Sequence, residues 1–251
     1  MRPAPVGFQC PECVGEAART VRQPVTVSGA RLVETPYLTY SIIALNAVVF
    51  GLQYLQGINQ LANEYGMWPF GIALDGEWYR LLTAAFLHGS ILHIAFNMFV
   101  LFSLGPTLER VLGHARFLVL YLVAALGGSV ASYVFSDPRT VSVGAAGAIF
   151  GLMGALVVAG RRLRWDITQV LMLLAVNVVI GFLSPGVDWR AHLGGLVVGG
   201  LVAAVFVWTP PPLERVRIAW QVAGVLAIVA VLVVVTMWRT GELVAMASAV
   251  G

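Results

Sequence analysis

The segment Gly144-Ala145-Ala146-Gly147-Ala148-Ile149-Phe150-Gly151 is apolar and repeats glycine at intervals of three or four residues. A second apolar segment, Ala191-His192-Leu193-Gly194-Gly195, puts an imidazole at the start of another expected membrane helix. Small residues at helical spacing allow two helix backbones to approach closely within a membrane. Ionisable residues there are costly and commonly mark a functional site. The two segments together predict close-packed membrane helices with a polar group at their contact.

The composition is that of a membrane protein. The chain has 251 residues, of which 59% are hydrophobic and 11% charged, whereas soluble domains average about 25% charged residues. A helix needs roughly 20 apolar residues to cross a bilayer. Seven such segments lie near 38–58, 91–109, 116–136, 144–160, 167–184, 190–209 and 217–238. We therefore predict an all-α, polytopic membrane helix bundle. The formal charge of +3, with no basic stripe, predicts no nucleic-acid partner.

The positions of the arginines predict the orientation of this bundle, because short cytoplasmic loops are enriched in basic residues. One set of connections carries Arg2, Arg19, Arg22, Arg31, Arg110, Arg116, Arg161, Arg162, Arg164, Arg215 and Arg217. The opposite set carries only Arg80, Arg139 and Arg190, mixed with acidic residues. We expect a cytoplasmic N-terminus and a multi-pass protein of the plasma membrane. Residues 1–30 lack the apolar core of a cleavable signal peptide.

The N-terminal segment contains Cys10-Pro11-Glu12-Cys13. A structural zinc ion needs four ligands, and no second cysteine pair follows. The pair is interpreted as a remnant of a zinc-binding module, as a peripheral thiol pair or as a chance occurrence. A structural disulfide is not expected in a segment predicted to be cytoplasmic. We expect no bound metal and no cofactor.

The second expected span carries three polar residues in a short stretch, His88, His93 and Asn97. His93 and Asn97 are four residues apart, so on a helix their side chains share one face. They are interpreted either as hydrogen-bonding contacts between helices or as one wall of a polarising pocket. A metal site made by His88, His93 and His192 is a further alternative, which is disfavoured because no carboxylate or cysteine ligand was identified to complete it.

The fourth expected span is short. From Gly144 to Gly160 it would rise about 25 Å, against roughly 30 Å of hydrocarbon. If Arg161, Arg162 and Arg164 anchor its cytoplasmic end, its N-terminus lies below the outer surface and residues 137–144 dip into the membrane. Such backbone is tolerated where it lines a water-filled cavity. The free N–H groups of a helix N-terminus could there stabilise a developing oxyanion.

These motifs, taken in order, resemble the rhomboid family of intramembrane serine proteases over about residues 37–210. The resemblance rests on His88, His93 and Asn97, on Gly144-Ala145-Ala146-Gly147, and on His192, Gly195 and Gly199. Trp78-Tyr79-Arg80 is similar to the family's Trp-Arg element in the first outer loop, with a tyrosine inserted. Glu109-Arg110 also matches the family pattern. Each motif alone is weak, and the ordered set is strong.

The resemblance implies a Ser–His dyad without an acidic third member. His192 would be the general base. His93, Asn97 and the backbone N–H of residue 146 would stabilise the oxyanion, and Gly144 and Gly147 would permit the tight backbone around the nucleophile. The implied partners are the lipid bilayer and transmembrane protein substrates, locally unwound at the site. No oligomeric state is predicted.

The resemblance also implies a division of the chain into three parts. Residues 1–36 would form the cytoplasmic N-terminal segment with the CxxC and a linker. Residues 37–210 would form a rhomboid core of six helices, and residues 211–251 an additional transmembrane helix and tail.

The sequence departs from the family pattern at one position, because Ala146 stands where a serine is expected. A methyl group cannot attack a carbonyl, so the chain is predicted to be inactive. Ser142 is expected to cap the fourth helix and not to replace the nucleophile. Either a native serine was replaced by an engineered alanine to trap an intact fold or a substrate complex, or the chain is a naturally inactive relative that binds or chaperones membrane proteins. The retention of His192, His93, Asn97 and the flanking glycines favours the first interpretation.

A transporter or channel is the remaining alternative. It would show inverted repeats or paired broken helices, and no convincing repeat relates the two halves of the chain.

Overall fold

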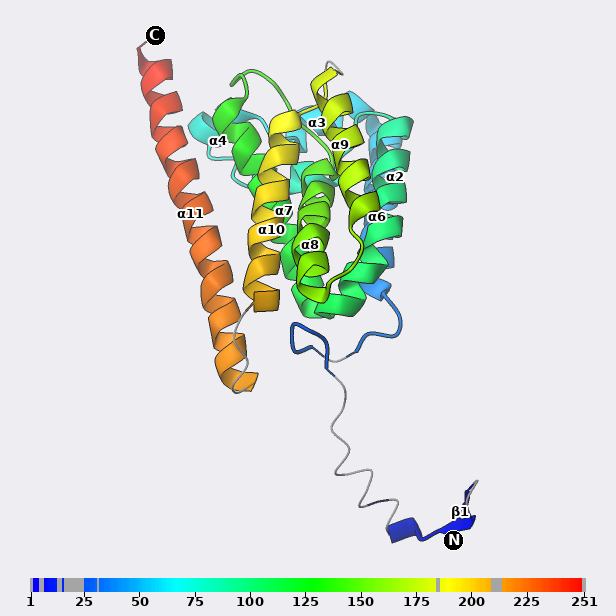
Figure 1. Ribbon diagram of the computed structural model, residues 1–251. Helices are drawn as coiled ribbons and strands as arrows, with labels where there is room; N and C mark the ends of the chain where they lie inside the picture. Colours follow the sequence, from blue (N-terminus) through cyan, green and yellow to red (C-terminus); the bar gives the residue numbers. More distant parts are fainter. Residues whose placement is uncertain are drawn as a thin grey trace.

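The computed structural model describes residues 2–4, 7–12, 15, 25–30, 32–183, 186–208 and 214–249. Near the N-terminus, β1 (Arg2–Ala4) and β2 (Gly7–Gln9) pair antiparallel. The elements that follow are helices: α2 (Tyr37–Gln56), α3 (Ile58–Tyr65), α4 (Pro69–Asp75), α5 (Arg80–Thr83), η1 (Ala84–Phe86), α6 (Ile91–Leu112), α7 (His114–Phe135), α8 (Ala146–Leu163), α9 (Thr168–Leu183), α10 (Trp189–Trp208) and α11 (Glu214–Ser248). The long helices form one bundle with α11 along its flank, and the two ends of the chain lie at opposite ends of it (Figure 1).

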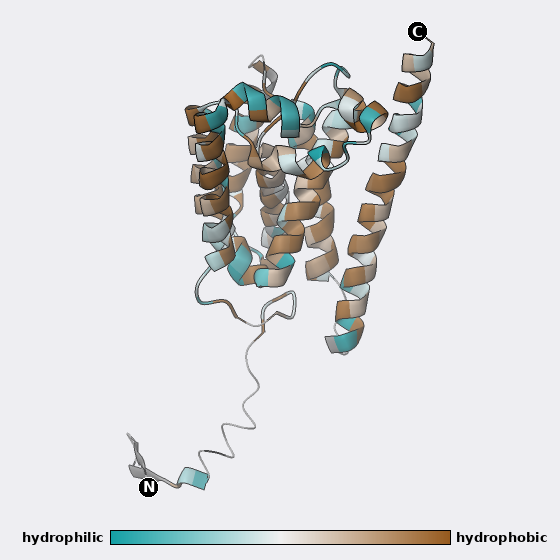
Figure 2. Cartoon of the chain, turned by 180° about the vertical axis from the view of Figure 1, so that it is seen from behind, coloured by the Kyte–Doolittle hydropathy of each residue, from teal (hydrophilic) through white to brown (hydrophobic). Residues whose placement is uncertain are grey.

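Among the described helices, α2, α6, α7, α8, α10 and α11 are long and apolar enough to cross a membrane. The fifth predicted span is shorter, because α9 has 16 residues, which is about 24 Å of helix. The last helix is longer than the predicted 217–238 and runs for 35 residues. Apolar residues cover most of α11, and hydrophilic residues gather toward the ends of the bundle (Figure 2). The prediction of an all-α, polytopic membrane protein is confirmed.

Glycines bring α8 and α10 into backbone contact. A Cβ placed on Gly195 would lie 1.9 Å from the carbonyl oxygen of Gly147. A Cβ placed on Gly199 would lie 2.3 Å from the Cα of Gly151, closer than real Cβ atoms approach any neighbour. The third helix, α7, joins through Gly128, whose Cβ position lies 3.1 Å from the Cα of Gly147. The sequence pattern did not predict that α7 packs against this contact between α8 and α10.

The carboxylate of Glu109, near the end of α6, caps the start of α2. It accepts hydrogen bonds from the backbone N–H of Leu38 (3.0 Å) and of Thr39 (2.8 Å) and from the Thr39 hydroxyl (2.7 Å). Pro36 at the N-cap of α2 supplies no side-chain acceptor of its own. A negative charge at a helix N-terminus also interacts favourably with the helix dipole. Glu109 is fully buried and therefore ties these two helices together from inside the bundle.

Candidate functional site

Four of the predicted site residues line one cavity. His93 and Asn97 of α6, Ala146 at the start of α8, and His192 in the first turn of α10 surround a space of about 110 Å³. The side chain of Ser90 caps α6 and accepts a hydrogen bond from the His93 backbone N–H at 3.2 Å. This cap starts the helix so that His93 and Asn97 share one face. Asn97 is buried, and its Nδ2 has no hydrogen-bond partner among the described residues.

A long hydrogen bond at Nδ1 favours one tautomer of the His93 imidazole. The backbone N–H of Gly89 donates to Nδ1 at 3.4 Å, so in the neutral ring the proton is carried by Nε2. The Nε2 edge packs against Gly144, where an added Cβ would lie 2.8 Å from that nitrogen. Gly144 also has a φ of +137°, in the region that favours glycine. Both its conformation and its space therefore require glycine.

The segment before α8 is held by backbone hydrogen bonds. Met67 and Ser142 pair as an antiparallel bridge with two N–H···O bonds of 2.9 Å. The N–H of Gly144 donates to the carbonyl oxygen of Ala84 at 2.9 Å. These contacts order the stretch that was predicted to dip into the membrane. The first turn of α8 consequently opens on the cavity, and the early N–H groups of a helix have no acceptor within that helix.

The imidazole of His192 stacks on the ring of Phe150, one turn into α8, with centroids 4.2 Å apart and planes inclined by 15°. Its Nδ1 is buried without a hydrogen-bond partner among the described residues. The same edge of the ring faces α9, where a Cβ added to Gly181 would lie 3.4 Å from Nδ1. Aromatic packing, rather than a carboxylate, therefore orients this imidazole.

His88 lies outside the cavity. It precedes α6, is fully buried, and its backbone exchanges hydrogen bonds with the Gln53 side chain at 2.9 and 3.3 Å. Its ring meets that of His93 edge-on, with centroids 5.1 Å apart. Within the described residues no three His, Cys, Asp or Glu side chains are placed to share a metal ion. His88, His93 and His192 are not among such a group in the described part of the chain. Of the CxxC pair, Cys13 lies outside the described residues.

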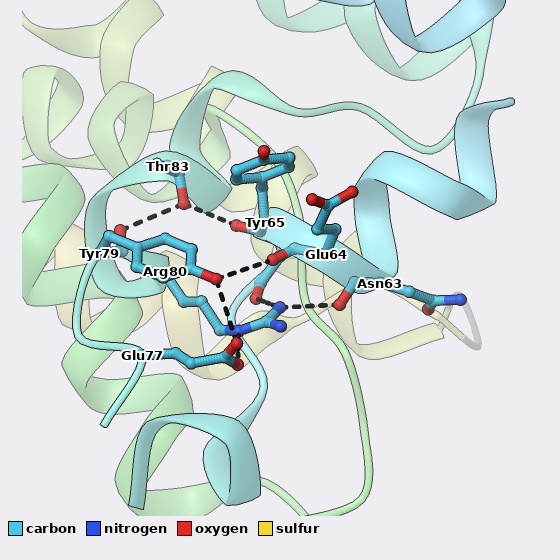
Figure 3. Close-up of polar contacts among 8 residues, drawn as sticks. Asn63, Glu64, Tyr65, Glu77, Tyr79, Arg80 and Thr83 are labelled. Atoms are coloured by element: carbon cyan, nitrogen blue, oxygen red, sulfur yellow. Dashed lines mark hydrogen bonds and ion pairs between the residues drawn. The ribbon is translucent and has the colours of Figure 1, made fainter. Parts of the chain in front are cut away.

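Arg80 of the Trp78-Tyr79-Arg80 element organises the connection between α2 and α6 (Figure 3). Its guanidinium donates to the carbonyl oxygens of Asn63 (2.8 Å) and Gly66 (3.0 Å) and to the Glu77 carboxylate (2.5 Å). This hydrogen bond from Arg80 lowers the pKa of Glu77 below its ordinary value. Gly66 directly precedes Met67, so the loop held by Arg80 supports the segment that leads into α8.

The prediction that Ser142 caps α8 is wrong. Ala145 is the N-cap residue, with no side-chain hydrogen bond, and the Ser142 hydroxyl instead donates to Asp188 at 2.7 Å. Asp188 is one of the acidic residues in the arginine-poor set of connections, and the sequence pattern predicts no role for it at the site. Its position four residues before His192 was the available signal. Asn177 of α9 also lines the cavity and was not singled out, although it is an amide within an otherwise apolar run.

The bundle and its cavity define an integral membrane protein with a buried polar site at a helix N-terminus. A model of the Rhomboid domain matches residues 75–209, which is more than half of the chain. The chain belongs to the rhomboid family.

Its similarity to curated proteins supports the same family assignment. It is 39% identical over 183 residues to Rhomboid protease GluP of Bacillus subtilis, covering 70% of this chain and 36% of that protein. It is 27% identical over 216 residues to Rhomboid protease AarA of Providencia stuartii, covering 72% of this chain and 75% of that protein. RHOMBOID-like protein 6, mitochondrial, of Arabidopsis thaliana is 37% identical over 147 residues, which is 55% of this chain and 47% of that protein. The chain thus spans about a third of the length of GluP.

Proposed function

We propose that this chain is the scaffold of an intramembrane serine protease of the Ser–His type, inactive as written because Ala146 occupies the nucleophile position. One observation carries the proposal: Ala146, His192, His93 and Asn97 line the same cavity. Relatives named as rhomboid proteases support the same reaction class. The three polar groups are those that acyl transfer requires beside a nucleophile.

With a serine at position 146, the hydroxyl oxygen would add to the substrate carbonyl carbon while His192 takes the hydroxyl proton. The tetrahedral intermediate would collapse by breaking the C–N bond, and the imidazolium would return that proton to the leaving amine. Water would then hydrolyse the acyl-enzyme through the same base. The stacked ring of Phe150 holds the imidazole, so no acidic partner is needed to orient it.

The developing oxyanion would be stabilised by three donors. These are the backbone N–H of residue 146, the Nε2–H of His93 and the Nδ2–H of Asn97. The tautomer of His93 and the unpartnered Nδ2 of Asn97 both support this assignment. Loss of one such donor commonly costs about 10²–10³ in rate.

The substrate would be a transmembrane segment. The cavity lies between membrane helices, because α9 lines it as well as α6, α8 and α10. A substrate that is helical at the site keeps its backbone carbonyls in its own hydrogen bonds. A local unwinding would therefore have to free the scissile peptide. Segments interrupted by glycine or proline unwind most readily.

The test is Ala146→Ser, reconstituted in liposomes with a panel of single-span proteins whose membrane segments carry glycine or proline at different depths. We expect cleavage that His192→Ala abolishes. If the Ala146→Ser variant cleaves none of the panel in liposomes or in detergent, the protease proposal is wrong.

A non-catalytic membrane-protein binder is the second candidate, and Ala146 itself favours it. The residue that the genomic codon specifies at position 146 separates the two. A serine codon supports the protease, whereas an alanine codon together with unaltered capture of membrane proteins by the His192→Ala variant supports the binder.

We also propose a plasma-membrane location with the N-terminus in the cytoplasm and the cavity opening to the outer side. The arginine distribution supports this orientation. An odd number of crossings, with α9 counted as one, would leave the C-terminus outside. Reporter fusions active only in the cytoplasm should give signal at the N-terminus and none at the C-terminus, and the reverse pattern would contradict the orientation.

A further inference from the structure

Asp188 joins three parts of the chain that are distant in sequence. Its Oδ2 accepts hydrogen bonds from the hydroxyls of Ser132 in α7 and of Ser142 in the segment before α8. Its Oδ1 accepts from the backbone N–H of Ala191 at 3.2 Å. That last bond makes Asp188 the N-cap of α10, since its side chain satisfies a donor of the first helical turn.

Positions 146 and 192 each follow, by four residues, a residue of this hydrogen-bonded group. Ser142 precedes Ala146 by four residues, and Asp188 precedes His192 by four residues. The backbone carbonyl of Asp188 also accepts from the His192 N–H at 3.3 Å. A single carboxylate thus links the segment leading to residue 146 with the first turn of the helix that carries His192.

We propose that Asp188 is a positioning residue for the dyad, which it aligns by holding the start of α8 against the start of α10. This inference rests on the proposed function. Asp188 does not touch the reacting atoms; it acts through Ser142 on one side and through the α10 cap on the other. Ser132 anchors the carboxylate to α7, the helix whose Gly128 already packs against Gly147.

The test uses the full chain with Ala146→Ser as the parent. Adding Ser142→Ala breaks the link to the α8 segment and leaves the α10 cap intact. We expect kcat to fall about tenfold or more while KM stays within about twofold, because a misplacement of about 1 Å can cost on the order of 10²-fold in rate. Asp188→Ala should lose at least as much, and combining it with Ser142→Ala should cost no more than Asp188→Ala alone. Asp188→Asn keeps a good N-cap acceptor and should retain most of the activity.

Ser103→Ala is the matched control, since it removes a serine hydroxyl whose hydrogen bond among the described residues stays within α6, to the Phe99 carbonyl oxygen at 2.8 Å. Labelling by a fluorophosphonate probe reports the alignment of the introduced hydroxyl independently of any substrate, and should fall in parallel with kcat. If Ala146→Ser cleaves and Ser142→Ala leaves kcat and labelling unchanged, the positioning role is wrong and the protease proposal stands. If Ala146→Ser is neither labelled nor able to cleave, the protease proposal is wrong, and the positioning role of Asp188, which rests on it, is wrong as well.

Discussion

The ring of Phe150 stacks on the imidazole of His192, with centroids 4.2 Å apart and planes inclined by 15°. Phe150 lies four residues after Ala146 on α8, so the helix that would carry the nucleophile also supports the base. The relative placement of the two groups is therefore built into the contact between α8 and α10.

Replacing Phe150 by leucine in the Ala146→Ser background should lower kcat, because the imidazole loses the flat surface that fixes its orientation. We expect a loss of about tenfold or more with little change in KM, and Phe150→Tyr should retain activity. Liposome cleavage assays measure both parameters. Phe135→Leu is the matched control, since that ring is largely exposed on the bundle surface. Equal activity of the Phe150→Leu and Phe135→Leu variants would contradict this role.

The contact between α8 and α10 itself predicts a sharp difference between two adjacent glycines. Gly199→Ala puts a Cβ 2.3 Å from the Gly151 Cα, whereas the nearest atom to a Cβ on Gly200 is 3.8 Å away. Overpacking of this kind costs about 1–3 kcal/mol. Thermal unfolding in detergent should show Gly199→Ala clearly destabilised and Gly200→Ala close to the parent. Similar melting temperatures for the two variants would show that α8 and α10 can move apart without loss of stability, and would contradict the close backbone contact at Gly199.

The sequence predicts those features of the site that depend on helical spacing. His93 and Asn97 share one face of α6, and the glycines of α8 meet those of α10. The sequence also predicts that α8 is a short helix. The first two features follow from periodicities of three and four residues. The role of Asp188 does not, because its partners Ser132 and Ser142 lie 56 and 46 residues away. Only the packing of α7, α8 and α10 brings these three side chains together. A short polar side chain such as serine does not indicate in the sequence which distant carboxylate it will contact.

The ion pair between Arg80 and Glu77 predicts a pH dependence on the acid side. Since Arg80 lowers the pKa of Glu77, the pair contributes stability above the ordinary carboxyl pKa and loses it as the pH falls through the lowered value. Arg80→Met should therefore make the melting temperature less sensitive to pH in this acid range. Arg239→Met, which removes a comparable pair with Glu242, is the control for a loss of charge elsewhere. An unchanged acid profile in Arg80→Met would argue against the coupling.

The cap on α2 predicts a large effect for a conservative change at the opposite end of the bundle from the segment that Arg80 holds. Glu109→Gln keeps the shape of the side chain but removes the charge from a carboxylate that accepts three hydrogen bonds from α2 and also contacts the His114 imidazole of α7 at 2.5 Å. Hydrogen bonds to charged groups contribute about 1.5–3 kcal/mol each, and a buried donor left unpaired costs more than a lost exposed bond. The variant should unfold at a clearly lower denaturant concentration. Glu242→Gln removes a carboxylate from a partly exposed pair, for which about 0–1 kcal/mol is expected. If both variants unfold together with the parent, Glu109 does not hold α2 to α6.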